Sequence, residues 1–123
     1  MSERPLLLLV DDEPRILSAL RRTLRREGYE IITAESSSEA LELLAERPVA
    51  LVVSDQKMRG MNGLEFLEAV ARRHPGVGRL LLTGWPEEVP AHQLEQLGIQ
   101  ALIPKPWDDT ALKDAIRRAL PPA

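Results

Sequence analysis

Three carboxylates, a hydroxyl and an ammonium stand at the ends of short apolar segments of the chain. Asp11 and Asp12 follow the run LLLLV, and Asp55 follows VALVVS. Thr83 closes RLLLT, and Lys105 comes two residues after IQALI. Carboxylate oxygens suit Mg²⁺, and a hydroxyl and an ammonium facing a metal-bound carboxylate could hold the other oxygens of a phosphoryl group on it. The residue types therefore indicate magnesium-dependent phosphoryl transfer, provided that the fold brings them together.

The apolar segments predict the architecture that positions these residues. They occupy residues 6–10, 30–34, 49–54, 79–83 and 99–103. Three of them lack the alternation of a half-exposed strand, which is typical of strands covered on both faces. Each is followed by a segment with helical periodicity, so the pattern predicts a parallel sheet with helices on both sides. Right-handed crossovers favour an α/β, flavodoxin-like (βα)5 doubly wound fold with strand order 2-1-3-4-5, in which residues 1–123 form a single domain.

Several helix starts carry recognisable signals. Capping residues precede three of the periodic segments: Ser36 with Glu39, Asn62 with Glu65, and Asp108. The fourth helix is different, because Pro86 and Pro90 interrupt its region. We expect regular helix there only from about Pro90 or Ala91.

The predicted strand order explains why the acids should meet. In an open parallel sheet, ligands bind beyond the carboxyl ends of the strands where the strand order reverses, here between the first and third strands. Asp11, Asp12 and Asp55 would share that edge and, if left unneutralised, raise one another's pKa values. Oxygen-only ligation in a small volume indicates Mg²⁺ as the cation that offsets their charge.

Composition excludes several other functions. The formal net charge is −3, which argues against direct binding to nucleic acid or to an anionic membrane. The chain has no cysteine, so disulfides, thiolate metal sites and cysteine nucleophiles are excluded. The first apolar run is too short to span a bilayer. These features favour a cytoplasmic protein.

The set Asp11-Asp12, Asp55, Thr83 and Lys105-Pro106 resembles the receiver domain of bacterial two-component response regulators, over essentially the whole chain. The resemblance implies that Asp55 is the phospho-accepting nucleophile, that Thr83 is the switch hydroxyl and that Lys105 is the phosphate partner. It implies direct Mg²⁺ ligation by Asp12 and Asp55, water-mediated action of Asp11, a further ligand from the backbone carbonyl of Lys57, and a cis Lys105-Pro106 peptide bond.

The resemblance also implies partners. The phosphodonor would be a histidine kinase or a histidine phosphotransfer protein, and the output would be an effector domain, a downstream protein or a homodimer. The domain would catalyse only its own phosphorylation and dephosphorylation, so we expect a switch and not an enzyme.

Three positions depart from the common receiver pattern. Arg59 stands where proline is frequent, and we expect a local effect on loop flexibility. Leu102 replaces an aromatic residue that usually couples the threonine to the surface of the fourth helix and fifth strand. Trp85 lies two residues beyond Thr83, and our hypothesis is that its indole shields the acyl phosphate from water and lengthens its lifetime.

Other readings of these residues remain open. Each functional residue taken alone is an ordinary cap, strand end or surface charge, and only their joint placement favours the switch. Leu102 motivates an alternative, a receiver-like interaction domain whose output is insensitive to phosphorylation. An aspartate-nucleophile phosphatase of the haloacid dehalogenase type is disfavoured because no second acid follows Asp55 by two positions. Five arginines of the first helix form either a solvated face or a docking stripe for an acidic phosphodonor: Arg15, Arg21, Arg22, Arg25 and Arg26.

Overall fold

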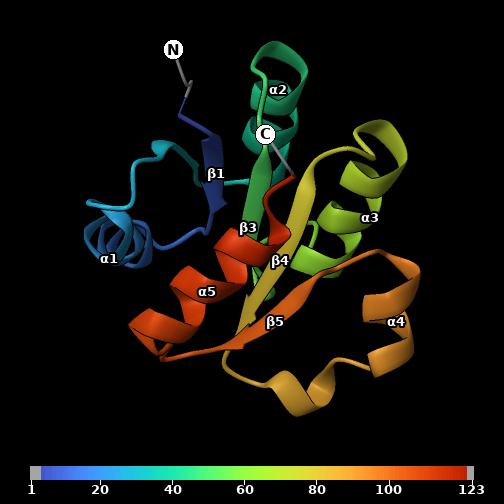
Figure 1. The fold of residues 1–123 in the computed structure, drawn as a ribbon. Helices are drawn as coiled ribbons and strands as arrows, with labels where there is room; N and C mark the ends of the chain where they lie inside the picture. Colours follow the sequence, from blue (N-terminus) through green and yellow to red (C-terminus); the bar gives the residue numbers. More distant parts are fainter. Residues whose placement is uncertain (1–3, 122–123) are drawn as a thin grey trace.

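Uninterrupted apolar runs become the central strands of a five-stranded parallel sheet. The computed structural model describes residues 4–121. Its strand order is β2-β1-β3-β4-β5, which confirms the prediction (Figure 1). The strands are β1 (Leu6–Val10), β2 (Glu30–Ala34), β3 (Leu51–Asp55), β4 (Gly78–Thr83) and β5 (Ala101–Pro104). Every residue of β1 and β3 is buried, as expected for strands covered on both faces.

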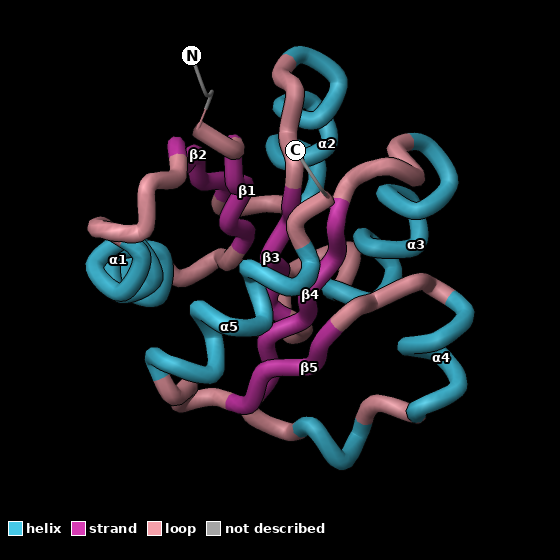
Figure 2. Tube along the Cα trace, viewed as in Figure 1, coloured by secondary structure: helices cyan, strands magenta, loops and turns pink. Residues whose placement is uncertain are grey.

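Helices cover both faces of the sheet (Figures 1 and 2). They are α1 (Pro14–Leu24), α2 (Ser37–Glu46), α3 (Gly63–Arg73), the single 3₁₀ turn η1 (Pro86–Glu88), α4 (Ala91–Gln96) and α5 (Asp109–Ala119). Buried side chains of α1 and α5 share one apolar core with alternate residues of the strands, and those of α2 and α3 share a second core on the opposite face. Both cores exclude water from the two faces of the sheet, so polar side chains of the sheet can meet solvent or a ligand only at the ends of the strands.

The predicted caps form with one variation. Asn62 makes a complete capping box with Glu65, and Asp108 accepts a hydrogen bond from the Ala111 amide at 2.8 Å. Ser36 accepts from the Glu39 amide at 3.1 Å, but the Glu39 carboxylate accepts from the Glu35 amide, one residue before the cap. Helix α4 begins at Ala91, where the prolines predicted it, and none of its residues is buried.

Several strand boundaries differ from the sequence prediction: β3 begins at Leu51 and not at residue 49, β4 begins at Gly78 and not at residue 79, and β5 ends at Pro104 and not at residue 103. Strand β3 also runs one residue further and ends on Asp55 itself, which pairs with Leu82 of β4, and the Gln56 amide donates to the Leu82 carbonyl at 3.0 Å. Strand β5 begins at Ala101 and not at Ile99. The reason is that Gly98 turns the chain with φ of 62°, and the Ile99 amide still donates to the Leu94 carbonyl at the end of α4. Apolar character marked Ile99 as buried but could not show that it belongs to a helix end.

Strand register places the polar residues side by side. Val10 of β1 pairs with Ser54 of β3, so the next residue of each segment, Asp11 and Asp55, also lies beside the other. Thr83 pairs with Pro104 between β4 and β5, so Lys105 follows directly beside the end of β4. Within residues 4–121, no helix is long and apolar enough to cross a membrane.

Candidate functional site

The three acids meet at the carboxyl edge of the sheet. Asp11, Asp12 and Asp55 each offer a carboxylate oxygen, and these oxygens all lie within 4.8 Å of one another. Asp11 is 1% exposed and Asp55 is 6% exposed, whereas Asp12 is half-buried. Two nearly buried carboxylates beside a third are unstable as anions unless cations compensate them.

Lys105 provides one such compensation. Its Nζ lies 2.7 Å from Asp55 Oδ1 and 3.1 Å from Asp11 Oδ2, so a single ammonium bridges acids from β3 and the end of β1. The backbone places it there, because the Lys105 amide donates to the Thr83 carbonyl at 2.8 Å and the Lys105–Pro106 peptide bond is cis, as the resemblance implies. The structure thus joins three of the residues that sequence reasoning selected.

The charges of this cluster shift one another's pKa values. Burial raises the pKa of Asp55 above its ordinary value, against the hydrogen bond and positive charge of Lys105. Burial also raises the pKa of Asp11; the Glu13 amide, which donates to Asp11 at 2.9 Å, opposes this, and the charge of Asp55 adds to it. Burial alone would lower the pKa of Lys105, but its hydrogen bond to Asp55 and the two negative charges raise it, so the ammonium stays protonated at neutral pH.

Helix α3 is seated directly against the end of β3. The Gly63 amide donates to the Gln56 carbonyl at 2.9 Å, and the Leu64 amide donates to Gln56 Oε1 at 2.9 Å. A Cβ atom at Gly63 would collide with the carbonyl oxygen of Asp55. Gln56 and Gly63 were not singled out from the sequence for this role, although a glycine at the first turn of a helix after a polar strand end is a signal for close backbone approach.

Thr83 lies at the same edge but faces the following loop. Its side chain is buried, and Oγ1 accepts a hydrogen bond from the Trp85 amide at 3.1 Å. Among residues 4–121 the structure records no hydrogen bond between Thr83 Oγ1 and the acids or Lys105 Nζ. Because Oγ1 acts as an acceptor here, its own proton remains available to a ligand.

Lys57 joins two loops across the edge of the sheet. Its Nζ lies 3.9 Å from the centre of the Trp85 ring and 3.8 Å from Glu88 Oε1. This cation–π contact connects the loop after β3 with the loop after β4. The predicted role of the Lys57 backbone carbonyl as a metal ligand remains a prediction.

Arg59 contacts the site in a way that sequence reasoning missed. Its backbone N–H donates to Asp12 Oδ2 at 3.2 Å, and its Nε lies 3.8 Å from the same oxygen. We expected only altered loop flexibility at this position. The missed signal is chemical: proline has no amide hydrogen, so any other residue there adds a donor next to the acids.

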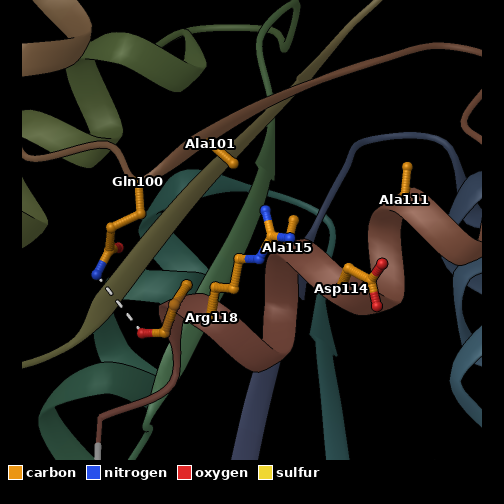
Figure 3. Close-up of a pocket in the computed structure, with 7 residues that line it drawn as sticks. Gln100, Ala101, Ala111, Asp114, Ala115 and Arg118 are labelled. Carbon is orange, nitrogen blue, oxygen red and sulfur yellow. Dashed lines mark hydrogen bonds between the residues drawn. The ribbon is translucent and has the colours of Figure 1, made fainter.

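A recess between β5 and α5 is unrelated to this chemistry. Its volume is about 410 Å³, and Figure 3 shows residues that line it. Gln100 sits at its rim, where Nε2 donates to the Ala119 carbonyl at 3.5 Å. Gln100 and Ala101 lie at the amino end of β5, opposite to the edge that carries Lys105, so this recess is not the site of the acids.

The donor set fits a hard divalent cation. Three carboxylates from two separate chain segments converge, and no histidine or cysteine lies among them. Mg²⁺ favours this all-oxygen chemistry and commonly binds through one or two carboxylates together with a phosphate. Asp11, Asp12 and Asp55 are the residues that would hold it.

Fold and site together define a class of protein: a doubly wound parallel sheet with an acid triad and a lysine at the carboxyl edge. The family model described as "Response regulator receiver domain" matches residues 7–117. The chain belongs to this family. Its members are signalling switches of two-component systems rather than true enzymes, and they typically work with histidine kinases.

Curated relatives and solved structures support this membership. The chain is 40% identical over 116 residues to the hydrogenase transcriptional regulatory protein HoxA of Cupriavidus necator, covering 93% of this chain and 24% of that protein. It is 39% identical over 121 residues to the transcriptional regulatory protein GlrR of Escherichia coli, covering 98% of this chain and 27% of that protein. The chain therefore spans about a quarter of the length of these relatives.

The structural likeness covers nearly the whole fold. A signal receiver domain of an HD domain-containing protein from Pseudomonas fluorescens matches with a TM-score of 0.87 and 35% identity, covering 95% of this chain and 94% of that one. The chemotaxis protein CheY4 of Vibrio cholerae matches with a TM-score of 0.86 and 29% identity, covering 96% of this chain and all of that one.

Proposed function

We propose that this chain is a phosphorylation-controlled switch in which Asp55 accepts a phosphoryl group from the phosphohistidine of a histidine kinase or a histidine phosphotransfer protein. One observation carries the proposal. Asp55 is nearly buried at the end of β3, lies 2.7 Å from the ammonium of Lys105, and shares its surroundings with two further acids. A purely structural ion pair would need one acid and not three.

The chemical step follows from this arrangement. A carboxylate oxygen of Asp55 attacks phosphorus, the P–N bond of the phosphohistidine breaks with its electron pair going to the imidazole nitrogen, and an acyl phosphate forms on Asp55. Lys105 holds one oxygen of the new phosphoryl group, and the hydroxyl of Thr83 turns its free proton to another. Asp12 and Asp55 would hold a Mg²⁺ ion, with Asp11 acting through water and the Lys57 carbonyl as a further ligand, and the cation would neutralise negative charge on the carboxylate and the phosphoryl group.

Phosphorylation then changes the charge at the sheet edge. Asp55 gains about −1.5 to −2 charge units at neutral pH, by analogy with other phosphorylated side chains. Lys105 and Thr83 lie at the ends of neighbouring strands and follow this charge, which shifts the population of surface states near α4 and β5. An effector domain, a downstream protein or a second copy of the chain in the cytoplasm reads that change.

Intact mass spectrometry tests the chemistry. The protein is incubated with Mg²⁺ and a small-molecule acyl phosphate, beside Asp55→Asn and the exposed-surface control Asp114→Asn. We expect one added phosphate on the wild type and on Asp114→Asn, none on Asp55→Asn, and none on any variant after chelation of Mg²⁺. Phosphate on Asp55→Asn, or none on the wild type, would contradict the proposal.

A second function is favoured by a specific feature of the output surface. Leu102 is half-buried against the core under α4, and α4 itself has no buried residue. An aliphatic side chain lacks the ring that could move inward with Thr83, so the domain could bind partners regardless of phosphorylation. Comparing partner binding or dimerisation of the phosphorylated wild type with Asp55→Asn separates the two functions, because equal behaviour supports the second.

A further inference from the structure

Asp12 is the acid of the site that Lys105 does not contact. The ammonium of Lys105 is shared by Asp11 and Asp55, at 3.1 and 2.7 Å. Among residues 4–121, the cation recorded beside Asp12 is Arg59, whose amide lies 3.2 Å and whose Nε lies 3.8 Å from Asp12 Oδ2. Within the described residues, the acid cluster therefore has two neighbouring cations: Lys105 beside Asp11 and Asp55, and the exposed Arg59 beside Asp12.

The loop between β3 and α3 brings Arg59 to this place. Met58, the residue before Arg59, is 9% exposed and belongs to the core. Gly60, the residue after Arg59, turns the chain with φ of 76°. The side chain of Arg59 is 92% exposed and has no other ion-pair or hydrogen-bond partner within the described residues. Asp12 is thus the contact that holds Arg59, although 47 residues separate the two along the chain.

We propose that Arg59 competes with the divalent cation for Asp12, so that binding of the cation displaces Arg59 and frees the loop of residues 57–61. The inference rests on the proposed function, because it takes Asp12 to be a ligand of the cation. Its physical basis is that a guanidinium beside Oδ2 already neutralises part of the carboxylate charge and repels a second cation arriving at the same group.

The exposure of the two partners sets the size of this repulsion. The Asp12 side chain is 21% exposed but the Arg59 side chain is 92% exposed, so water screens much of the interaction and the competition is modest. The same loop carries Lys57, whose carbonyl is an expected ligand of the cation and whose ammonium lies over Trp85. Loop position and occupancy of the metal site are therefore coupled, and each biases the other.

Calorimetric titration of the chelator-treated full chain with Mg²⁺, at constant ionic strength, tests the competition. Arg59→Ala removes the guanidinium and keeps the amide, whereas Arg59→Pro removes both contacts. Arg72→Ala is the matched control, because it loses the same charge from an exposed position on α3 that has no recorded partner. We expect Mg²⁺ to bind Arg59→Ala about two- to fivefold more tightly than the wild type, and Arg72→Ala like the wild type.

A second readout does not depend on affinity. In the ¹⁵N-labelled wild type, the Arg59 amide should lose its Asp12 hydrogen bond when Mg²⁺ binds, and its resonance should move with the same titration midpoint. Equal or weaker Mg²⁺ binding in Arg59→Ala, or an Arg59 amide unmoved by saturating Mg²⁺, would overturn the competition. If Arg59→Pro fails to fold, Arg59→Ala and the amide resonance still decide.

Parallel titrations of Asp12→Asn and Asp55→Asn separate this inference from the proposed function. Mg²⁺ binding to the wild type that is lost in both variants supports the acid site itself, whatever the result at Arg59. Absence of Mg²⁺ binding in the wild type and in every Arg59 variant would overturn both the acid site and the competition.

Discussion

Lys105 compensates the negative charge of the two buried acids of the site. Its ammonium is recorded within 3.1 Å of both Asp11 and Asp55, and these two carboxylates are almost fully removed from water. An ion pair of this kind adds little net stability when complete, but loss of one member leaves an uncompensated charge in the interior.

Lys105→Ala should therefore destabilise the metal-free protein by about 3 kcal/mol, as typical for a broken buried pair. Urea unfolding with a chelator present measures this, and added Mg²⁺ should restore part of the loss. Lys113→Ala is the control, because its ion pair with Glu27 is longer, at 3.7 Å, and more exposed. A Lys105→Ala protein as stable as the wild type would show that the acids are protonated or solvated instead.

The pKa of Asp55 leads to a prediction about pH. Folding raises this pKa above 3.8, so the ionised carboxylate destabilises the metal-free folded state at neutral pH. That effect disappears as the pH falls through the raised pKa towards 3.8. Asp55→Asn should be more stable than the wild type at pH 7 in chelator, with a difference that narrows on acidification. Thermal unfolding across this range is the measurement, and a difference that widens at low pH would contradict it.

At the scale of elements, the close packing of α3 against the end of β3 positions Asp55, the proposed phospho-acceptor. Gly63 permits this close packing, because a Cβ atom there would collide with the Asp55 carbonyl oxygen. The same Cβ would also lie 2.8 Å from Leu81 Cδ1 and 2.9 Å from Gln56 Cα. The helix can accordingly donate its first amides to Gln56 only while position 63 has no side chain.

Gly63→Ala should lower the free energy of unfolding by about 1–3 kcal/mol through overpacking, and it should also slow phosphorylation by shifting Asp55. Gly76→Ala is a matched control, since a Cβ at Gly76 meets nothing within 4 Å and its φ is not positive. Denaturant unfolding and the rate of mass gain with a phosphodonor measure the two effects. Unchanged stability of Gly63→Ala would mean that α3 can move away freely.

The loops after β3 and β4 form a second unit at this scale. Lys57 and Trp85 hold them together across the site edge, with the indole 48% exposed. Trp85→Ala should open this edge to water and speed the decay of the acyl phosphate several-fold. The decay of phosphorylated protein after removal of donor measures the effect, and equal or slower decay in the variant would refute the shielding hypothesis.

At the scale of the whole molecule, positive charge gathers on the surface of α1 although the net charge is −3. Three of the five arginines predicted on the first helix lie on α1, namely Arg15, Arg21 and Arg22, whereas Arg25 and Arg26 follow its last residue, Leu24. All five are exposed, and none has a recorded acidic partner within residues 4–121. Arg21, Arg22 and Arg25 line a shallow recess of about 440 Å³ beside Tyr29. An acidic partner could be steered by this face over distances set by salt screening.

Arg22→Glu should slow phosphotransfer from a phosphorylated histidine protein by about tenfold at low ionic strength, with a smaller effect at high salt. The matched control Arg72→Glu changes the same charge on α3, across the sheet from α1, and should leave the rate unchanged. Rapid-mixing kinetics at two salt concentrations measure this. A rate insensitive both to salt and to Arg22→Glu would assign the arginines to a solvated surface.

Much of the architecture was already determined by local sequence. Buried runs such as LLLLV and LVVS favoured covered strands, and the helical stripes between them favoured crossovers. The predicted strand order 2-1-3-4-5 is confirmed, and the predicted meeting of the acids is observed. Caps at Asn62 and Asp108 marked helix starts because their side chains bond to amides only three residues away.

Tertiary structure decided the features that depend on distance through space. The sequence contained Lys105, but only strand register placed its ammonium between Asp11 and Asp55. The pairing of Arg59 with Asp12 and of Lys57 with Trp85 joins segments that no periodicity relates. Periodicity reports which face of an element a residue occupies, whereas long-range ion pairs depend on how loops close over that face, and their energies are too small to leave a pattern in the sequence.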